Sequence, residues 1–190
     1  MAKILALVGS PRKGGNVDTI IDEIIKGANS KNVEINKIYL NDMNIKGCQG
    51  CFYCRKNPVC IIDDDMSKIY KLIEDAEYII IGTPVYICQV SAQTKLLLDR
   101  LYPFTEIDKY KHIPRFGNKK LIMIYSQAAP ISFLFKSYFK YTAKHLKCMG
   151  LTHYKTLIST KAFEKGSTKN NKKLLKKASD LGQIIAKDVL

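Results

Sequence analysis

The stretch KILALVGSPRKGGNVDTIIDEIIKGA, residues 3–28, determines the class of fold. Residues 3–9 form a short apolar run ending in glycine, which is typical of a buried strand in a parallel sheet. From Asn16 to Ala28, isoleucines and other apolar residues recur at steps of three and four, which predicts an amphipathic helix. A buried strand, a short loop and a helix in succession indicate a parallel α/β protein.

The same alternation continues to the end of the chain. Further strands are predicted over 33–40, 77–86, 119–127 and 151–160, and further helices over 66–75, 91–101, 131–149 and from 169 onward. This order predicts a parallel sheet with helices on both faces. We expect a single domain over 1–190, because the length suits one domain and the sequence shows no linker or repeat.

The composition excludes several classes of protein. The net charge of +14 invites a nucleic-acid interpretation, but no zinc-finger, RRM or helix-turn-helix pattern accompanies it, so we expect no nucleic-acid partner. No apolar run is long enough to cross a bilayer, and the start does not resemble a secretory signal. We therefore expect a cytoplasmic protein without membrane contact, whose six cysteines are thiols or metal ligands rather than disulfides.

The loop GSPRKGGN, residues 9–16, joins the first strand to the first helix. A helix N-terminus offers free N–H groups and positive potential to an anion, while Arg12 and Lys13 add charge. The loop lacks both the G-x-G-x-x-G fingerprint and the Gly-Lys-Ser/Thr of a P-loop. The sequence thus predicts a phosphate site that belongs to neither of these classes.

Three segments together resemble a known family. They are VGSPRKGGN (8–16), the cysteine-rich stretch GCQGCFYCRKNPVC (47–60) and IIIGTPVYICQVSAQTKLLLDR (79–100). They resemble the NAD(P)H-dependent FMN reductase branch of the flavodoxin-like superfamily, including its iron–sulfur flavoproteins. The resemblance implies a flavodoxin-like three-layer sandwich with a five-stranded parallel sheet in the order 2-1-3-4-5.

The resemblance also implies a set of FMN-binding residues. No side chain is expected to be catalytic, because the flavin carries the chemistry. Val17 stands where many relatives have threonine. The implied residues are Ser10, Arg12, Lys13, Gly15, Asn16 and Val17 around the phosphate, and Pro84, Val85, Tyr86, Ile87, Ser126, Gln127 and Ala128 around the ring.

The cysteine segment, residues 47–60, has the spacing C-x2-C-x2-C-x5-C. This pattern resembles the start of a ferredoxin ligand run and favours a [4Fe–4S] cluster. Zinc bound by four thiolates, a redox-active thiol set and a segment without any metal stay open as alternatives. The candidate ligands are Cys48, Cys51, Cys54 and Cys60.

Two smaller features have competing interpretations. Asp63, Asp64 and Asp65 precede a predicted helix, and a helix N-terminus explains them more simply than a cation site. Cys88 follows the predicted ring loop, where it either faces the flavin or is a small buried residue.

The leading prediction is an FMN-dependent enzyme that passes electrons from NAD(P)H through FMN to a second acceptor, such as a flavin or a quinone. The alternative is an iron–sulfur flavoprotein that transfers electrons through a cluster to a redox protein. A third hypothesis is a zinc or thiol module that binds no flavin. The resemblance further implies a homodimer or homotetramer.

Overall fold

The structure is a computed structural model that describes residues 3–30, 33 and 35–190. Its first half contains β1 (Ile4–Val8), α1 (Asn16–Asn29), β2 (Ile35–Tyr39), α2 (Tyr53–Lys56), α3 (Met66–Asp75), β3 (Tyr78–Tyr86), β4 (Gln89–Val90) and α4 (Ala92–Asp99). Its second half contains β5 (Thr105–Asp108), β6 (Lys111–Pro114), β7 (Lys119–Ser126), α5 (Lys136–Leu146), β8 (Leu151–Ser159) and α6 (Lys172–Val189). Residue 34, within the predicted strand 33–40, lies outside the described residues.

Five of the strands form one parallel sheet in the order β2-β1-β3-β7-β8. The predicted flavodoxin-like order 2-1-3-4-5 is therefore confirmed. The short strand β4 extends this sheet by pairing antiparallel with the end of β3. The pair β5–β6 forms a separate antiparallel hairpin.

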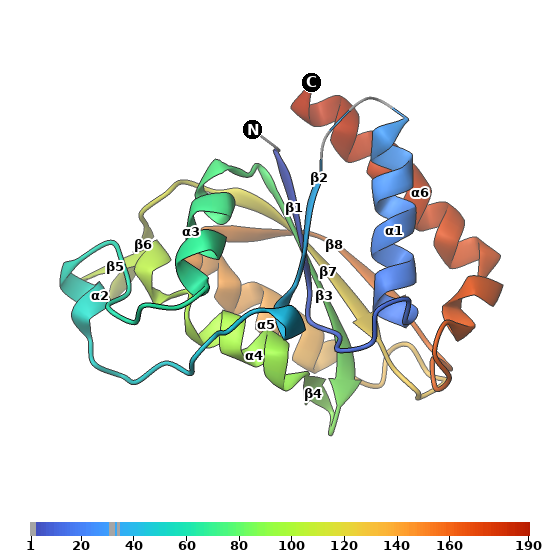
Figure 1. Ribbon diagram of the computed structural model, residues 1–190, viewed down its shortest axis with the longest axis horizontal. Coiled ribbons are helices and arrows are strands. Elements are labelled where there is room, and N and C mark those ends of the chain that lie inside the picture. The colour runs from blue at the N-terminus through green and yellow to red at the C-terminus, as the bar shows by residue number, and fades with distance from the viewer. Residues whose placement is uncertain (1–2, 31–32, 34) are drawn as a thin grey trace.

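The sheet lies between two layers of helices. Figure 1 shows α1 and α6 on one face and α3, α4 and α5 on the other. Successive side chains of a strand point to opposite faces, so Ile4, Ala6 and Val8 pack toward α1 and α6, while Leu5 and Leu7 pack toward the second layer. Because both faces are covered, every residue of β1 is buried.

Two predicted helix boundaries differ from the structure. The helix expected over 131–149 begins only at Lys136, because Leu134 and Lys136 donate their N–H groups three residues back, in turns. The last helix begins at Lys172 rather than Lys169, because the Asn171 side chain accepts a hydrogen bond from the N–H of Leu174 and caps the helix there. The stretch 102–118, in which no strand or helix was predicted, holds the β5–β6 hairpin.

Helices α1 and α6 approach each other at two glycines. A Cβ atom on Gly27 would lie 2.1 Å from the carbonyl oxygen of Ser179, and one on Gly182 would lie 2.0 Å from that of Ile24. Since the atoms opposite are main-chain atoms of a packed helix, they cannot move aside cheaply. The close packing of these two helices therefore depends on the absence of a side chain at Gly27 and at Gly182.

We expect Gly27→Ala to lower the free energy of unfolding by about 1–3 kcal/mol, because overpacking shifts a main chain. Urea denaturation measures the change. Gly47→Ala is the control, since its Cβ would meet only Leu96 Cδ2 at 3.8 Å. Equal stability of the two variants would show that α1 and α6 separate without cost.

Among the described residues, no helix is long and apolar enough to cross a membrane.

Candidate functional site

A cleft of about 250 Å³ opens beyond the carboxyl ends of β1, β3, β7 and β8. Ligands of open α/β sheets bind at this edge, where the strand order reverses. The loops after all four strands contribute to the cleft. Its lining residues are Ser10, Arg12, Asn16, Val17, Pro84, Val85, Tyr86, Ser126, Ala128, Ala162, Phe163 and Lys165.

The first loop forms a tight turn whose hydrogen-bond donors face the cleft side of the sheet. The Ser10 side chain is buried, and its Oγ accepts the N–H of Arg12 at 3.2 Å, which leaves the hydroxyl proton for a ligand. Gly15 donates its N–H to the carbonyl of Arg12 at 3.0 Å, and a Cβ there would lie 2.7 Å from that oxygen. The first N–H groups of α1 have no acceptor within the helix and are available to an anion.

A buried carboxylate supports this loop from inside. Asp18 Oδ2 accepts the N–H of Gly14 at 2.6 Å, and Asp18 forms an ion pair with Lys37. Burial alone lowers the pKa of Lys37, but its bonds to Asp18 and Asp22 outweigh burial and raise it, so Lys37 stays charged. The negative charge of Asp18 is therefore neutralised and does not oppose a phosphate.

The two cations of the first loop point to different places. Arg12 lines the cleft, whereas Lys13 forms an ion pair with Asp42 at 2.6 Å and lies over the Tyr39 ring, 5.1 Å from its centroid. The hydrogen bond and charge of Asp42 raise the pKa of Lys13. Lys13 is thus engaged outside the cleft, although it was predicted as a phosphate ligand.

Asn16 uses its side chain to hold another loop. Its Nδ2 donates to the carbonyls of Ala162 and Glu164 at 3.2 and 2.8 Å, and its Oδ1 accepts the N–H of Thr168 at 2.9 Å. With the amide engaged in this way, the part of Asn16 left for a phosphate is its main-chain N–H. Its side chain joins the start of α1 to the loop after β8.

That loop adds three cleft residues that were not predicted from the sequence, Ala162, Phe163 and Lys165. Phe163 lines the cleft with 80% of its side chain exposed. Lys165 lies beside the first loop, where its Cε is 3.9 Å from the position of a Cβ on Gly14. The signal that could have found them is the strand 151–160, which ends at the same edge of the sheet as the other three strands.

The second loop continues β3 into a tight hairpin with β4. Pro84, Val85 and Tyr86 line the cleft, while Ile87 and Cys88 form the turn with φ values of 45° and 64°. Ile87 is 94% exposed and lies outside the cleft lining. Cys88 is also exposed, so the interpretation of Cys88 as a small buried residue is wrong.

In the third loop, Ser126 and Ala128 line the cleft, whereas Gln127 supports the loop. Gln127 is buried and donates from Nε2 to the carbonyl of Ile131 at 2.9 Å. Its Oε1 has no partner among the described residues. Ser126 and Ala128 therefore face the cleft, and Gln127 holds the turn between them and α5.

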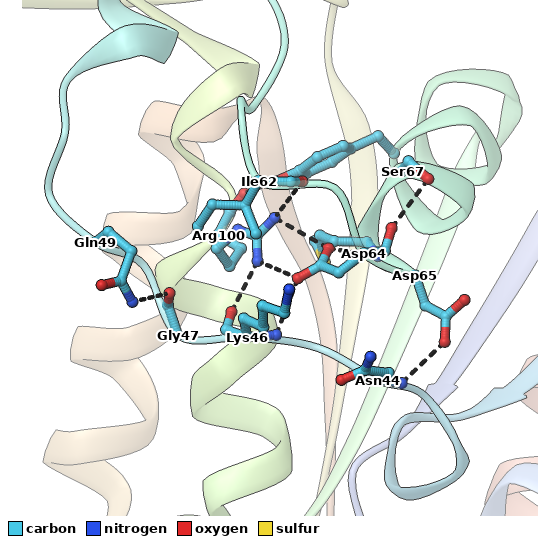
Figure 2. A network of polar contacts seen from close by, with 11 residues as sticks. Asn44, Lys46, Gly47, Gln49, Ile62, Asp64, Asp65, Ser67 and Arg100 are labelled. Atoms are coloured by element: carbon cyan, nitrogen blue, oxygen red, sulfur yellow. Dashed lines mark hydrogen bonds and ion pairs between the residues drawn. The ribbon is translucent and has the colours of Figure 1, made fainter.

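A buried ion pair between Asp64 and Arg100 holds the residues on either side of the cysteine segment. Asp64 and Arg100 are 0% and 1% exposed, and Arg100 Nη1 lies 2.6 Å from Asp64 Oδ2 (Figure 2). Asp64 also accepts the N–H groups of Lys46 and Met66, at 2.9 and 3.0 Å. Asp64 thus caps the start of α3, as expected for an aspartate before a helix, but its buried partner comes from the end of α4.

All four thiols of the segment are free and at least partly exposed. Cys48 and Cys51 are exposed, and Cys54 and Cys60 are partly exposed. Burial raises the pKa of Cys54, and the charge of Cys60 raises it further, with smaller effects of Cys48 and Cys51. In the part of the chain that the structure describes, no three His, Cys, Asp or Glu side chains gather as a metal-binding group. A metal site at these cysteines stays a prediction.

A parallel sheet of this order, with a cleft at the edge where the strand order reverses, defines a flavodoxin-like protein. The family model for NADPH-dependent FMN reductase matches residues 2–131. The chain therefore belongs to this family, which confirms the resemblance found in the sequence.

Curated relatives include iron–sulfur flavoproteins. The chain is 38% identical over 98 residues to one from Methanosarcina thermophila, a match that covers 52% of this chain and 51% of the relative. It is 33% identical over 102 residues to one from Archaeoglobus fulgidus, covering 54% and 46%. The chain thus matches about half the length of these curated relatives.

Solved structures share the fold at low identity. An FMN-dependent NADH-azoreductase from Bacillus anthracis superposes with a TM-score of 0.71 at 12% identity, covering 100% of this chain and 99% of that one. An NAD(P)H:quinone oxidoreductase from Methanothermobacter marburgensis gives a TM-score of 0.73 at 12% identity, covering 96% and 98%. These likenesses show the flavodoxin-like fold over nearly the whole chain.

Proposed function

We propose that the cleft binds FMN and that the protein uses it to pass electrons from NAD(P)H to a second acceptor. The observation that carries this proposal is the cleft itself, where the phosphate turn and the ring-side loops meet at one edge of the sheet. Arg12 and Lys165 supply two positive charges, which match the charge of a phosphate monoester near neutral pH. The Ser10 hydroxyl and the first N–H groups of α1 supply hydrogen-bond donors.

The residues present fit the rest of FMN as well. Pro84, Val85 and Tyr86 offer apolar surface for the isoalloxazine ring, and the exposed Phe163 offers more on the opposite loop. FMN, when bound, would supply the two-electron chemistry that links a nicotinamide to a flavin or quinone acceptor. The chain's own residues at the cleft would hold and orient the ring.

Two measurements test this proposal. Titration of FMN with the purified protein should quench flavin fluorescence with a dissociation constant in the micromolar range or below, about −8 kcal/mol. The loaded protein should oxidise NADPH or NADH when a quinone or free flavin is added. Absence of quenching after addition of excess FMN would contradict the assignment of the cleft.

We expect Asn16→Ala to weaken FMN binding about tenfold, because the loop that carries Phe163 and Lys165 loses its hydrogen bonds to α1. Hydrogen exchange of residues 160–168 should rise in the same variant. Asn171→Ala, which removes a helix cap distant from Asn16 in sequence, is the control and should leave both quantities nearly unchanged. An unchanged affinity for Asn16→Ala would show that the loop keeps its place without the amide.

A second candidate function, electron transfer through a [4Fe–4S] cluster, is favoured by the cysteine segment. The segment carries four free thiols within fourteen residues. Thiolates are the usual ligands of such clusters, and the two curated relatives described above are named iron–sulfur flavoproteins. Protein purified without oxygen should then contain iron and sulfide and absorb broadly near 400 nm. Flavin bands without iron would support the reductase alone.

The assembly is a further part of the proposal. We propose a homodimer or homotetramer, supported by exposed apolar side chains such as Phe133 and Leu134, which are 70% and 55% exposed. Light scattering coupled to size-exclusion chromatography tests this, and a monomer at micromolar concentration would contradict it. The single domain over 1–190, a redox-protein partner and the cytoplasmic location stay predictions.

A further inference from the structure

Arginine is rare in this chain, and its few positions are concentrated at the cleft and around the cysteine segment. Of 31 basic residues only four are arginine. Arg12 lines the cleft, and the other three belong to the cysteine segment or bond to it: Arg55 within it, Arg100 after α4 and Arg115 after β6. A guanidinium presents five N–H donors in a rigid plane, which a lysine ammonium cannot imitate. At Arg100 and Arg115 the guanidinium therefore serves for several directed hydrogen bonds and not for charge alone.

Arg100 joins the two ends of the cysteine segment. Its Nη1 donates to the carbonyl of Lys46 at 2.7 Å and to Asp64 Oδ2 at 2.6 Å, as Figure 2 shows. Its Nη2 donates to Asp64 Oδ1 at 3.1 Å and to the carbonyl of Ile62 at 3.5 Å. One buried side chain thus bonds residues on both sides of the segment and closes it into a loop.

Arg115 holds the middle of the segment. Its Nη1 donates to the carbonyls of Cys54 and Asn57 at 2.8 and 2.9 Å, and its Nη2 donates to that of Arg55 at 3.1 Å. These carbonyls lie at the C-terminal end of the one-turn helix α2, where no intrahelical donor is left for them. The third Nη1 acceptor, the carbonyl of Pro103 at 3.3 Å, ties the segment to the stretch before β5.

The segment itself contains backbone that needs support. Phe52, directly before α2, has a φ of 60°, a left-handed conformation that costs a residue with a Cβ about 1–2 kcal/mol. Such a residue persists only where its surroundings hold it in place. The Arg55 guanidinium lies over the Phe52 ring, 4.1 Å from the centroid, and Arg115 bonds the carbonyls of the helix that follows.

We infer that Arg100 and Arg115 are positioning residues that set the shape of the cysteine segment before any metal binds. Arg100 closes the ends of the segment, and Arg115 anchors its middle to the β5–β6 hairpin. The part of this inference that concerns metal binding rests on the proposed iron–sulfur function. The part that concerns the position of the segment does not. The stretch 102–118, in which the sequence predicted no strand or helix, thus supports the cysteine segment.

Arg115→Lys is the decisive variant, because it keeps the charge and loses the planar set of donors. Pulsed alkylation with iodoacetamide, read by mass spectrometry on the full-length reduced protein, should show Cys54 reacting about five to ten times faster than in the unmodified protein. Cys88, in the β3–β4 turn, is the internal control and should keep its rate within twofold. Lys111→Ala, an exposed position on β6, is the matched control variant. Arg100→Lys should speed the alkylation of Cys60 in the same way. If Arg100→Lys does not fold, the result for Arg115→Lys alone supports or overturns the inference.

A second readout reports on the geometry of the sulfur atoms. Co²⁺ titrated into the apoprotein under anaerobic conditions gives thiolate charge-transfer bands when several cysteines converge on the ion. Arg115→Lys should weaken the apparent Co²⁺ affinity about 10–100-fold, as loss of supporting contacts around metal ligands does. Alkylation rates equal to those of the unmodified protein for all four cysteines would overturn the inference. If the unmodified protein takes up no Co²⁺, the iron–sulfur proposal fails, and the alkylation comparison alone supports or overturns the role of the arginines.

Discussion

Asp64→Ala is expected to lower the free energy of unfolding by about 3–5 kcal/mol, because it leaves the Arg100 guanidinium buried without its counter-charge. The side chains of both partners are almost fully buried, so water cannot replace the lost carboxylate. The change also opens the contact between the two ends of the cysteine segment. Guanidinium chloride denaturation at neutral pH, followed by circular dichroism, measures the effect.

Asp65→Ala is the matched control for this variant. Asp65 is the adjacent residue, and it accepts bonds from the N–H of Asn44 and from Lys68 at a more exposed position. Surface ion pairs contribute about 0–1 kcal/mol, so the control should lose no more than that. Similar losses of unfolding free energy in the two variants would show that the buried Asp64–Arg100 pair contributes no more to stability than a surface pair does.

The same ion pair predicts a dependence of stability on pH. Burial alone raises the pKa of Asp64, but the bonds from Arg100 and from the N–H groups of Lys46 and Met66 outweigh it and hold the pKa below its ordinary value. The stabilisation is therefore fully present above the unfolded pKa of about 3.9 and is lost as pH falls through the lower folded value. Asp64→Asn should flatten the loss of stability below about pH 4. A slope identical to that of the unmodified protein would contradict this assignment.

Arg12→Ala and Lys165→Ala are each expected to raise the dissociation constant of FMN about 10–100-fold, because each removes a charge-assisted contact worth about 1.5–3 kcal/mol. Combined, the two substitutions should approach the sum of the two free-energy losses if the side chains contact the phosphate independently. Fluorescence titration with FMN measures both. Riboflavin, which lacks the phosphate, should bind the variants and the unmodified protein with similar affinity.

Lys13→Ala is the matched control for these variants. Lys13 is adjacent to Arg12 in sequence and carries the same charge, but Asp42 holds it outside the cleft. We expect its loss to change FMN affinity less than about threefold, the size of a screened long-range effect. A loss as large as that of Arg12→Ala would mean that Lys13 leaves Asp42 and turns to the phosphate.

The fold could be read from the sequence because its signals are local and repeated. Strands β1, β3 and β7 contain continuous apolar runs, and helices α1, α3 and α6 each bury one apolar face. The helix boundary at Lys136 was missed because apolar residues 131–135 extend the helical pattern while the chain still turns. The β5–β6 hairpin was missed because its short, largely exposed strands have no apolar alternation.

The candidate site could also be predicted in part from the sequence, because some of its signals are local. The predicted residues that line the cleft lie at the carboxyl ends of strands, in the loops that follow them or at the start of α1, and a parallel sheet brings these parts to one edge. Which side chains turn into the cleft depends on distant partners. Lys13 is drawn away by Asp42, and Asn16 is engaged by the loop after β8, which itself brings Lys165 to the phosphate turn.

The sequence by itself determined the alternation of strands and helices, the phosphate turn and the set of four cysteines, because each depends on residues near one another in the chain. Only the tertiary structure decided which cations lie at the cleft and how the cysteine segment is held. Arg100 and Asp64 are 36 positions apart, and Arg115 and Cys54 are 61 apart. No periodicity links such residues, and their contacts exist only because a folded chain excludes water and leaves each buried polar group to find a partner within the protein.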